Sequence, residues 1–232
     1  MVEPDPQAGP PVPMEEWEGL DDLRPRWAAL AVVTTLAGFS DSCWADEVGW
    51  HHEDGDGNAI HLILAPEGRA VLYGRDHEVS VTTARGEEVD VVTQAPDWVR
   101  GLVDPWHGEL DAERPGFVYW LDDDTWERVA YPGDPDEPEP DGASAVGRFM
   151  FDDDQAVIEV LDWATQWVWD AAGAEWDGDE PELVAAGHAL IDDLRTPGEE
   201  RQAVETFLAV LAPGGVVADI DSAADSAADF AL

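Results

Sequence analysis

The stretch SCWADEVGWHHEDGDGNAIHLILAPEGRAVLYGRDHEVSVTT, residues 42–83, carries the clearest strand and turn pattern of the chain. Two runs of alternating apolar residues flank the turn composition Pro66-Glu67-Gly68-Arg69, and this pattern predicts a β-hairpin. If the turn centres on Glu67-Gly68, Leu64 lies opposite Val71. Both faces are apolar near the turn. The sequence therefore predicts two central strands that are covered on each side.

The same stretch holds four of the six histidines of the chain, and carboxylates gather with them at the open end of the predicted hairpin. Imidazole and carboxylate groups are ligands that suit Zn, Mn or Fe. The spacing contains no His-Glu-x-x-His and no zinc-type cysteine pair, so exposed histidines in an acidic loop are the ordinary interpretation. A divalent metal site is the alternative interpretation, and its candidate ligands are His52, His61, Asp76 and His77.

The charge of the chain is extreme. Among 232 residues, 53 are Asp or Glu and 11 are basic, which gives a formal net charge of −42; all the basic residues are Arg. Direct nucleic-acid binding is disfavoured, because it depends on Lys and Arg that neutralise phosphates. Three explanations stay open: composition bias from salt adaptation or a GC-rich genome, an acidic surface for a basic partner, and mimicry of DNA. Mimicry needs regular bands of carboxylates, whereas these are scattered along the sequence.

Other features of composition indicate the class and location of the protein. Hydrophobic residues make up 44% of the chain and 12 residues are Trp, which is enough to bury a core. The single cysteine, Cys43, excludes an internal disulfide and favours a reducing compartment. The N-terminus lacks the pattern of a signal peptide, and the longest apolar run, 27–33, is far shorter than the roughly 20 residues of a membrane span. We therefore expect a cytoplasmic protein that does not bind membranes.

The N-terminal segment predicts two helices, Met14–Leu23 and Arg26–Ala37, with Pro25 as the interruption between them. The second helix is apolar almost all round, so we expect it to lie deep in the fold. Further along, Phe117–Tyr131 predicts a second hairpin with its turn at an Asp-Asp-Asp-Thr sequence.

Short turns between neighbouring strands favour an antiparallel sheet, and helical periodicity dominates after residue 144. The predicted fold class is α+β: an antiparallel sheet with N-terminal helices and a C-terminal three-helix part. We expect a disordered arm at 1–13, helix plus antiparallel sheet at 14–132, an acidic Pro-rich linker at 133–143, a mainly helical part that packs on the sheet at 144–213, and a flexible tail at 214–232.

One resemblance is carried by the run from Cys43-Trp44 through Trp50-His51-His52 to Gly68-Arg69-Ala70-Val71-Leu72 and Asp76-His77-Glu78. Residues 43–78 resemble acidic proteins of high-GC actinobacteria, and this likeness implies no function. The general make-up, an acidic α+β domain without a catalytic signature, is similar to that of bacterial immunity proteins that neutralise toxins. This second likeness is one of character alone.

The sequence contains no serine elbow, glycine-rich phosphate loop or Walker sequence, which are the common hydrolase and nucleotide-binding signals. Our leading hypothesis is a non-enzymatic acidic binding protein, inhibitor- or immunity-like, that acts on a basic protein partner and needs no cofactor. The alternative is a metal-dependent hydrolase that uses the His/Asp ligands named above. Aromatic residues at element ends are often anchors of binding interfaces, although packing in the core or at its edge is the ordinary interpretation, and acids in a hairpin turn are explained by the turn itself. The candidate partner-binding residues are Trp50, Asp54, Asp56, Trp106, Asp122, Asp123 and Asp124.

Overall fold

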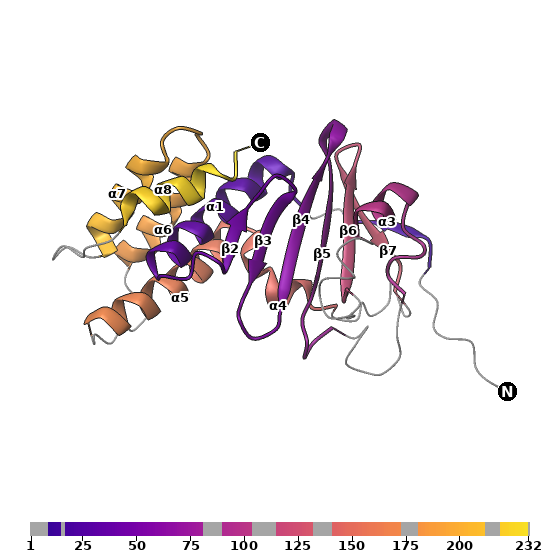
Figure 1. Cartoon of the computed structure of the whole chain (residues 1–232), viewed down its shortest axis with the longest axis horizontal. Helices are drawn as coiled ribbons and strands as arrows, with labels where there is room; N and C mark the ends of the chain where they lie inside the picture. Colours follow the sequence, from indigo (N-terminus) through magenta and orange to yellow (C-terminus); the bar gives the residue numbers. More distant parts are fainter. Residues whose placement is uncertain are drawn as a thin grey trace. The chain divides into compact units, whose positions relative to one another are not determined.

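The structure is a computed structural model that describes residues 9–14, 17–80, 90–103, 115–131, 141–172, 181–211 and 219–231, leaving out the side chains of 167–172. Figure 1 labels its helices and strands. In chain order they are β1 Pro11–Pro13, α1 Leu20–Leu36, β2 Cys43–Ala45, β3 Gly49–Glu53, β4 Ala59–Ala65, the short 3-10 turn η1 Pro66–Gly68, β5 Arg69–Arg75, α3 Asp97–Val103, β6 Phe117–Asp122, β7 Thr125–Val129, α4 Ala143–Val146, η3 Arg148–Met150, α5 Asp153–Ala172, α6 Pro181–Leu194, α7 Glu200–Leu211 and α8 Ile220–Ala228.

The strands form one antiparallel sheet in the order β1-β7-β6-β5-β4-β3-β2. This sheet, together with the helices at the C-terminal end of the chain, confirms the predicted α+β class. Figure 1 shows β4 to β7 side by side, as expected for strands joined by short turns. No helix within the described ranges is both long and apolar enough to cross a membrane.

The first hairpin forms where the sequence predicts it, but in a register that differs by one residue. Val71 pairs with Ile63 instead of the expected Leu64. The reason is the loop: it contains three residues, Pro66–Gly68, and Glu67 adopts a positive φ of 69°. Because side chains alternate along a strand, the shift changes which residues share a face.

The second hairpin confirms its prediction. Asp122 pairs with Thr125, and the two residues between them, Asp123 and Asp124, adopt positive φ values of 47° and 59°. Two left-handed residues give the tight turn whose twist matches antiparallel strands, and aspartate tolerates this conformation better than most residues.

The chain divides into two compact units. Unit 1 comprises residues 1–17 and 51–147, and unit 2 comprises 18–50 and 148–232. The sequence predicted a different division, with the first helix in the same part as the sheet. Instead α1 belongs with the C-terminal helices, because a helix that is apolar on all sides needs other helices around it.

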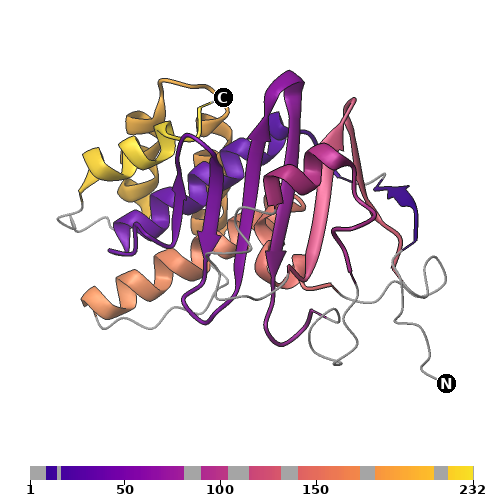
Figure 2. The ribbon, with the colours of Figure 1, turned by 45° about the vertical axis from the view of Figure 1, so that its right-hand side comes forward.

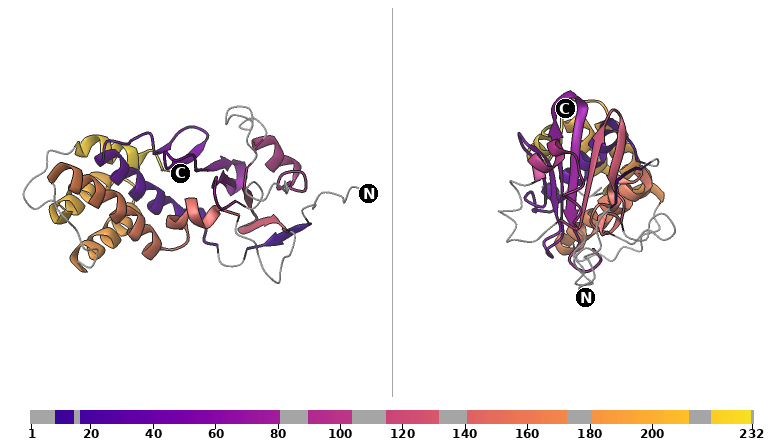
Figure 3. Two further views of the ribbon diagram at one scale, coloured as in Figure 1. Left: turned by 90° about the horizontal axis from the view of Figure 1, so that it is seen from below. Right: turned by 90° about the vertical axis from the view of Figure 1, so that its right-hand side faces the viewer.

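In unit 2, α1 packs against α5, α6 and α8, and Figure 3 shows these helices gathered together. A single helix runs through Pro25, which corrects the prediction of two helices separated by that proline. A proline inside a helix costs about 3 kcal/mol. This cost is outweighed by packing, since Leu23 and Trp27 on either side of Pro25 are completely buried.

The N-terminal arm also differs from its prediction. Pro11–Pro13 pair with β7, and Pro11 lies opposite Val129. Proline is tolerated there because β1 lies at the end of the strand order, where a missing N–H does not interrupt a central ladder.

The tail likewise contains a helix, α8, in place of the expected flexible segment. Asp219 caps it by accepting a hydrogen bond from the backbone N–H of Ser222 at 3.0 Å. Alanines such as Ala223 and Ala227 are buried and allow α8 to approach α1 closely, while Phe230 is completely buried beyond the helix end. Small residues that look like low-complexity sequence are therefore a packing surface.

In unit 1, α3 lies against β5, as Figure 2 shows. The guanidinium of Arg69 stacks over the ring of Trp98, at 4.9 Å from its centroid. The last residues of the predicted linker are not extended: Asp141 is largely buried, and Ala143 begins the short helix α4, which contacts β4 and β5.

Candidate functional site

The predicted metal ligands His52 and His61 point to opposite faces of the strands. The ring of His61 meets His51 instead, with 2.9 Å between the two Nδ1 atoms. Because neighbouring side chains in a strand alternate, His52 lies on the other face.

The other two predicted ligands have local structural roles. Asp76 Oδ1 accepts hydrogen bonds from the backbone N–H groups of Glu78 at 2.8 Å and Val79 at 2.6 Å, which builds the turn after β5. His77 is exposed, and its ring Nδ1 lies 2.7 Å from Asn58 Oδ1. The predicted set is therefore not brought together, and the described residues contain no group of three or more His, Cys, Asp or Glu side chains placed to hold a metal ion.

The contact between His51 and His61 is a buried polar contact that was not predicted from the sequence. Both imidazoles are almost completely buried, and Tyr73, directly opposite His61 on β5, lies with its ring centroid 5.2 Å from that of His61. The Tyr73 hydroxyl has no hydrogen-bond partner among the described residues, and burial raises its pKa well above the ordinary value. Tyr73 is therefore neutral at physiological pH. A bond between two Nδ1 atoms requires one ring to donate and the other to accept.

Replacing His61 with leucine should lower the free energy of unfolding by about 1–3 kcal/mol, because the Nδ1 of buried His51 loses this hydrogen bond. Urea unfolding followed by circular dichroism measures the loss. The double variant His51→Leu/His61→Leu should lose less than the sum of the two single variants, since neither polar ring then remains without the other. Additive losses would show that the two rings are not coupled.

A second buried polar group, Asp141, holds the chain against the sheet of unit 1. The hydroxyls of Tyr119 and Tyr131 both donate to Asp141 Oδ2, the latter at 2.8 Å. Its carbonyl accepts from Ser80 Oγ at 2.5 Å, and Oδ1 accepts from the backbone N–H of Ala143 at 3.1 Å. Burial, and next the charge of Asp141, raise the pKa of Tyr119. A carboxylate satisfied on both oxygens is typical of a structural anchor.

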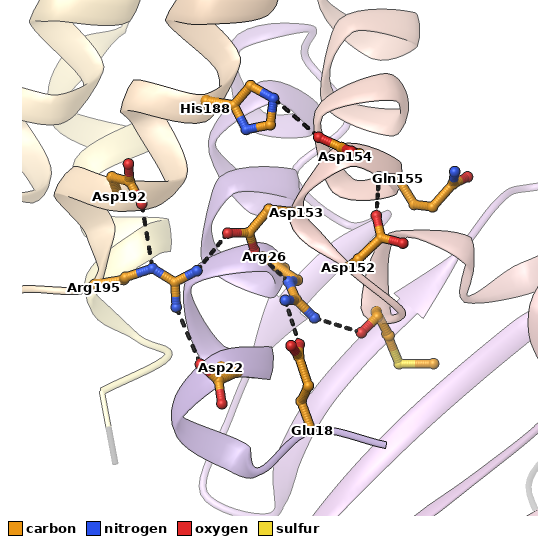
Figure 4. Close-up of polar contacts among 11 residues, drawn as sticks. Glu18, Asp22, Arg26, Asp152, Asp153, Asp154, Gln155, His188, Asp192 and Arg195 are labelled. Carbon is orange, nitrogen blue, oxygen red and sulfur yellow. Dashed lines mark hydrogen bonds and ion pairs between the residues drawn. The ribbon is translucent and has the colours of Figure 1, made fainter. Parts of the chain in front are cut away.

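Unit 2 contains an ion-pair network centred on Asp153, which Figure 4 shows between Arg26 and Arg195. Asp153 Oδ1 accepts from Arg26 Nε at 2.7 Å, and Oδ2 accepts from Arg195 Nη2 at 2.6 Å. Partial burial acts to raise the pKa of Asp153, but the hydrogen bonds and charges of the two arginines lower it below its ordinary value. Arg26 is almost completely buried, and it also contacts Glu18 and donates to the carbonyl of Met150 at 2.8 Å.

The network extends along α1 and α6. Arg24 donates from Nη2 to the carbonyls of Leu194 and Arg195, both at 2.8 Å, at the C-terminal end of α6. A cation there satisfies carbonyls that a helix end leaves without intrahelical partners. Sequence reasoning missed this arrangement. The available signal was two arginines, Arg24 and Arg26, within a run whose other residues are mostly apolar.

The candidate partner-binding residues occupy different environments. Trp50 is buried, with 1% of its surface exposed, and its ring packs against Trp27 and Phe230, so it is a core residue and not an interface anchor. The expectation that Trp50 contacts a partner is thereby corrected. Trp106 lies outside the described residues.

The acidic candidates lie at two ends of the strands. Asp54 and Asp56 are in the loop between β3 and β4, where Asp54 Oδ1 accepts from the backbone N–H of Asp56 at 2.8 Å. Asp122 to Asp124 form the turn between β6 and β7. In an antiparallel sheet of this order, the β6–β7 turn lies at the same end as the β4–β5 turn and at the opposite end from the β3–β4 loop (Figure 1). One flat partner surface cannot cover both sets.

The described arginines are engaged within the chain. Their contacts are Arg24 with two carbonyls, Arg26 with Glu18 and Asp153, Arg69 with Glu67 and the Trp98 ring, Arg100 with Asp97, Arg128 with the Val129 carbonyl and the Tyr131 ring, Arg148 with Glu159 and Asp162, Arg195 with Asp22, Asp153 and Asp192, and Arg201 with Glu205 and Asp221. Arg75 also has an interaction.

Comparison of the chain with protein-family models, curated proteins and solved structures found no match.

Proposed function

We propose that the protein is a non-enzymatic acidic binding protein, inhibitor- or immunity-like, whose partner is a basic protein. The observation that supports this function is the internal use of the arginines described above. Most of the described arginines pair with particular carboxylates of the same chain, so they do not neutralise acidic residues elsewhere on the surface. The large surplus of the 53 acidic residues therefore gives the surface a negative field.

Such a field favours fast association with a positively charged protein. Electrostatic steering raises association rates above the ordinary range of about 10⁵–10⁶ M⁻¹s⁻¹, and salt weakens it over a Debye length of about 8 Å at physiological ionic strength. We propose a cytoplasmic location, since the only cysteine, Cys43, is a free buried thiol whose pKa is raised by burial. A metal-dependent hydrolase is not a second candidate, because its proposed ligands lie apart.

The test is affinity capture from lysate of the source cells at about 0.05 M and 0.5 M salt, with beads that carry poly-glutamate as a control for charge alone. We expect a basic protein that is retained by this protein and not by poly-glutamate, and that is released at the higher salt. Association of the purified pair, measured by calorimetry, completes the test.

Two outcomes would contradict the proposal. If both kinds of bead retain the same proteins, the negative charge acts without specificity. If the protein captures nothing and its helical circular dichroism is lost at low salt, the composition reflects salt adaptation. Capture that is abolished by competing DNA would indicate a partner that binds nucleic acid, which is the result that mimicry of DNA predicts.

A further inference from the structure

The most exposed large hydrophobic residue among those described is Phe39, in unit 2, with 53% of its surface accessible. Its backbone is fixed by the end of α1. Gly38 has a φ of +85°, its N–H donates to the Thr35 carbonyl at 3.0 Å, and the Phe39 N–H donates to the Thr34 carbonyl at 2.8 Å. These two bonds form a Schellman motif, in which the residue after the glycine usually makes an apolar contact with the preceding turn of the helix.

Phe39 makes its aromatic contact with another helix. Its ring packs edge-on against Trp163 of α5, with 5.8 Å between the ring centroids, and Trp163 itself is partly exposed. The two rings therefore form an exposed aromatic pair on a rigid backbone. Among the other exposed apolar side chains of unit 2, Ile158 and Val184 are aliphatic, and Phe151 is aromatic with 37% of its surface accessible. Aromatic rings in fixed positions are typical anchors of binding interfaces, whereas a single exposed aliphatic residue is ordinary.

An acidic residue, Asp41, follows Phe39 by two positions in the chain. The Ser42 N–H donates to the Phe39 carbonyl at 2.9 Å, which closes a turn that contains the exposed carboxylate of Asp41. The face of an aromatic ring attracts a cation, and a nearby carboxylate adds to that attraction. An exposed ring with a carboxylate nearby in the chain suits a guanidinium group, which is cationic and planar.

We propose that Phe39 and Trp163 form a docking surface for an arginine side chain of a basic protein partner, with Asp41 as the neighbouring carboxylate. This inference rests on the proposed function and specifies where and how the partner binds. Arginine fits better than lysine, because its planar guanidinium stacks on an aromatic face while it donates hydrogen bonds to a carboxylate.

The test uses a defined probe, the peptide acetyl-Arg-Gly-Arg-Gly-Arg-Gly-Arg-amide, titrated into the full chain by calorimetry at about 0.15 M salt. Phe39→Ala should weaken binding about fivefold, although it leaves the net charge unchanged. Phe39→Leu should weaken it similarly, because it retains apolar surface but removes the ring. Ile158→Ala, on the same helix as Trp163, is the matched control and should bind as the wild type does. The equivalent lysine peptide should bind more weakly than the arginine peptide.

Equal affinity of Phe39→Ala and wild type would overturn the docking surface, and so would an equal loss in Ile158→Ala. Circular dichroism establishes that each variant is folded, which is expected because both side chains are exposed. The proposed function and the docking surface can be contradicted independently of each other. If a captured partner binds Phe39→Ala as tightly as wild type, the docking surface is contradicted and the proposed function is not. If the capture experiment yields no specific partner, the proposed function is contradicted, whatever the affinity of the arginine peptide.

Discussion

Replacement of Trp27 by alanine should lower the free energy of unfolding by about 3–5 kcal/mol, the largest effect expected for one substitution in this chain. Trp27 is completely buried in unit 2, where its ring contacts those of Trp50, Phe149 and Phe230 at centroid distances of 6.1, 5.1 and 6.3 Å. These rings come from α1, β3, η3 and the residues after α8. Removing the indole therefore leaves a cavity where four segments meet.

Chemical denaturation followed by circular dichroism at 222 nm measures the effect, because unit 2 is rich in helix. Trp98→Ala is a control of the same chemistry at a partly exposed position of unit 1, and it should cost about 1 kcal/mol. Comparable losses in the two variants would contradict a core centred on Trp27.

Substitution of Asp153 by asparagine should destabilise the protein by about 2 kcal/mol, because two arginines then lose their shared carboxylate. The loss is smaller than for a fully isolated buried charge, since Arg26 still contacts Glu18 and the Met150 carbonyl. Asp154→Asn is the matched control: the neighbouring carboxylate is exposed, and its ion-pair partner among the described residues is the half-exposed His188 at 3.3 Å. It should change stability by less than about 0.5 kcal/mol.

The ion pairs of Asp153 also make the free energy of unfolding depend on pH. The pKa of Asp153 is lower in the folded state than in the unfolded chain, so its contribution is fully present above the unfolded pKa of about 4. It is lost as the pH falls through the lower, folded pKa. Stability measured between about pH 6 and pH 2 should therefore decline less steeply in Asp153→Asn than in wild type. Parallel declines would show that Asp153 does not sense its arginine partners.

How much of this protein follows from sequence alone depends on how local the deciding interactions are. Hairpin 117–131, with two aspartates in its turn, and the helices that begin at Asp153 and Pro181 depend on periodicity, turn residues and caps, which act over a few residues. The positive φ of Glu67 is also local, yet residue type did not reveal it. A loop longer by one residue than expected shifted the hairpin register. The predicted ligands of the metal site lie apart for another reason: His51, and not His52, faces His61.

The sequence by itself determined the α+β class, the two hairpins, the deep burial of the helix around Trp27 and the excess of negative charge, because pattern and composition are properties of the chain alone. Only the tertiary structure decided that the helix runs through Pro25, that His51 meets His61, and that most of the described arginines pair with carboxylates of the same chain. Those outcomes depend on partners that are distant in sequence, and packing against such partners outweighs local propensity.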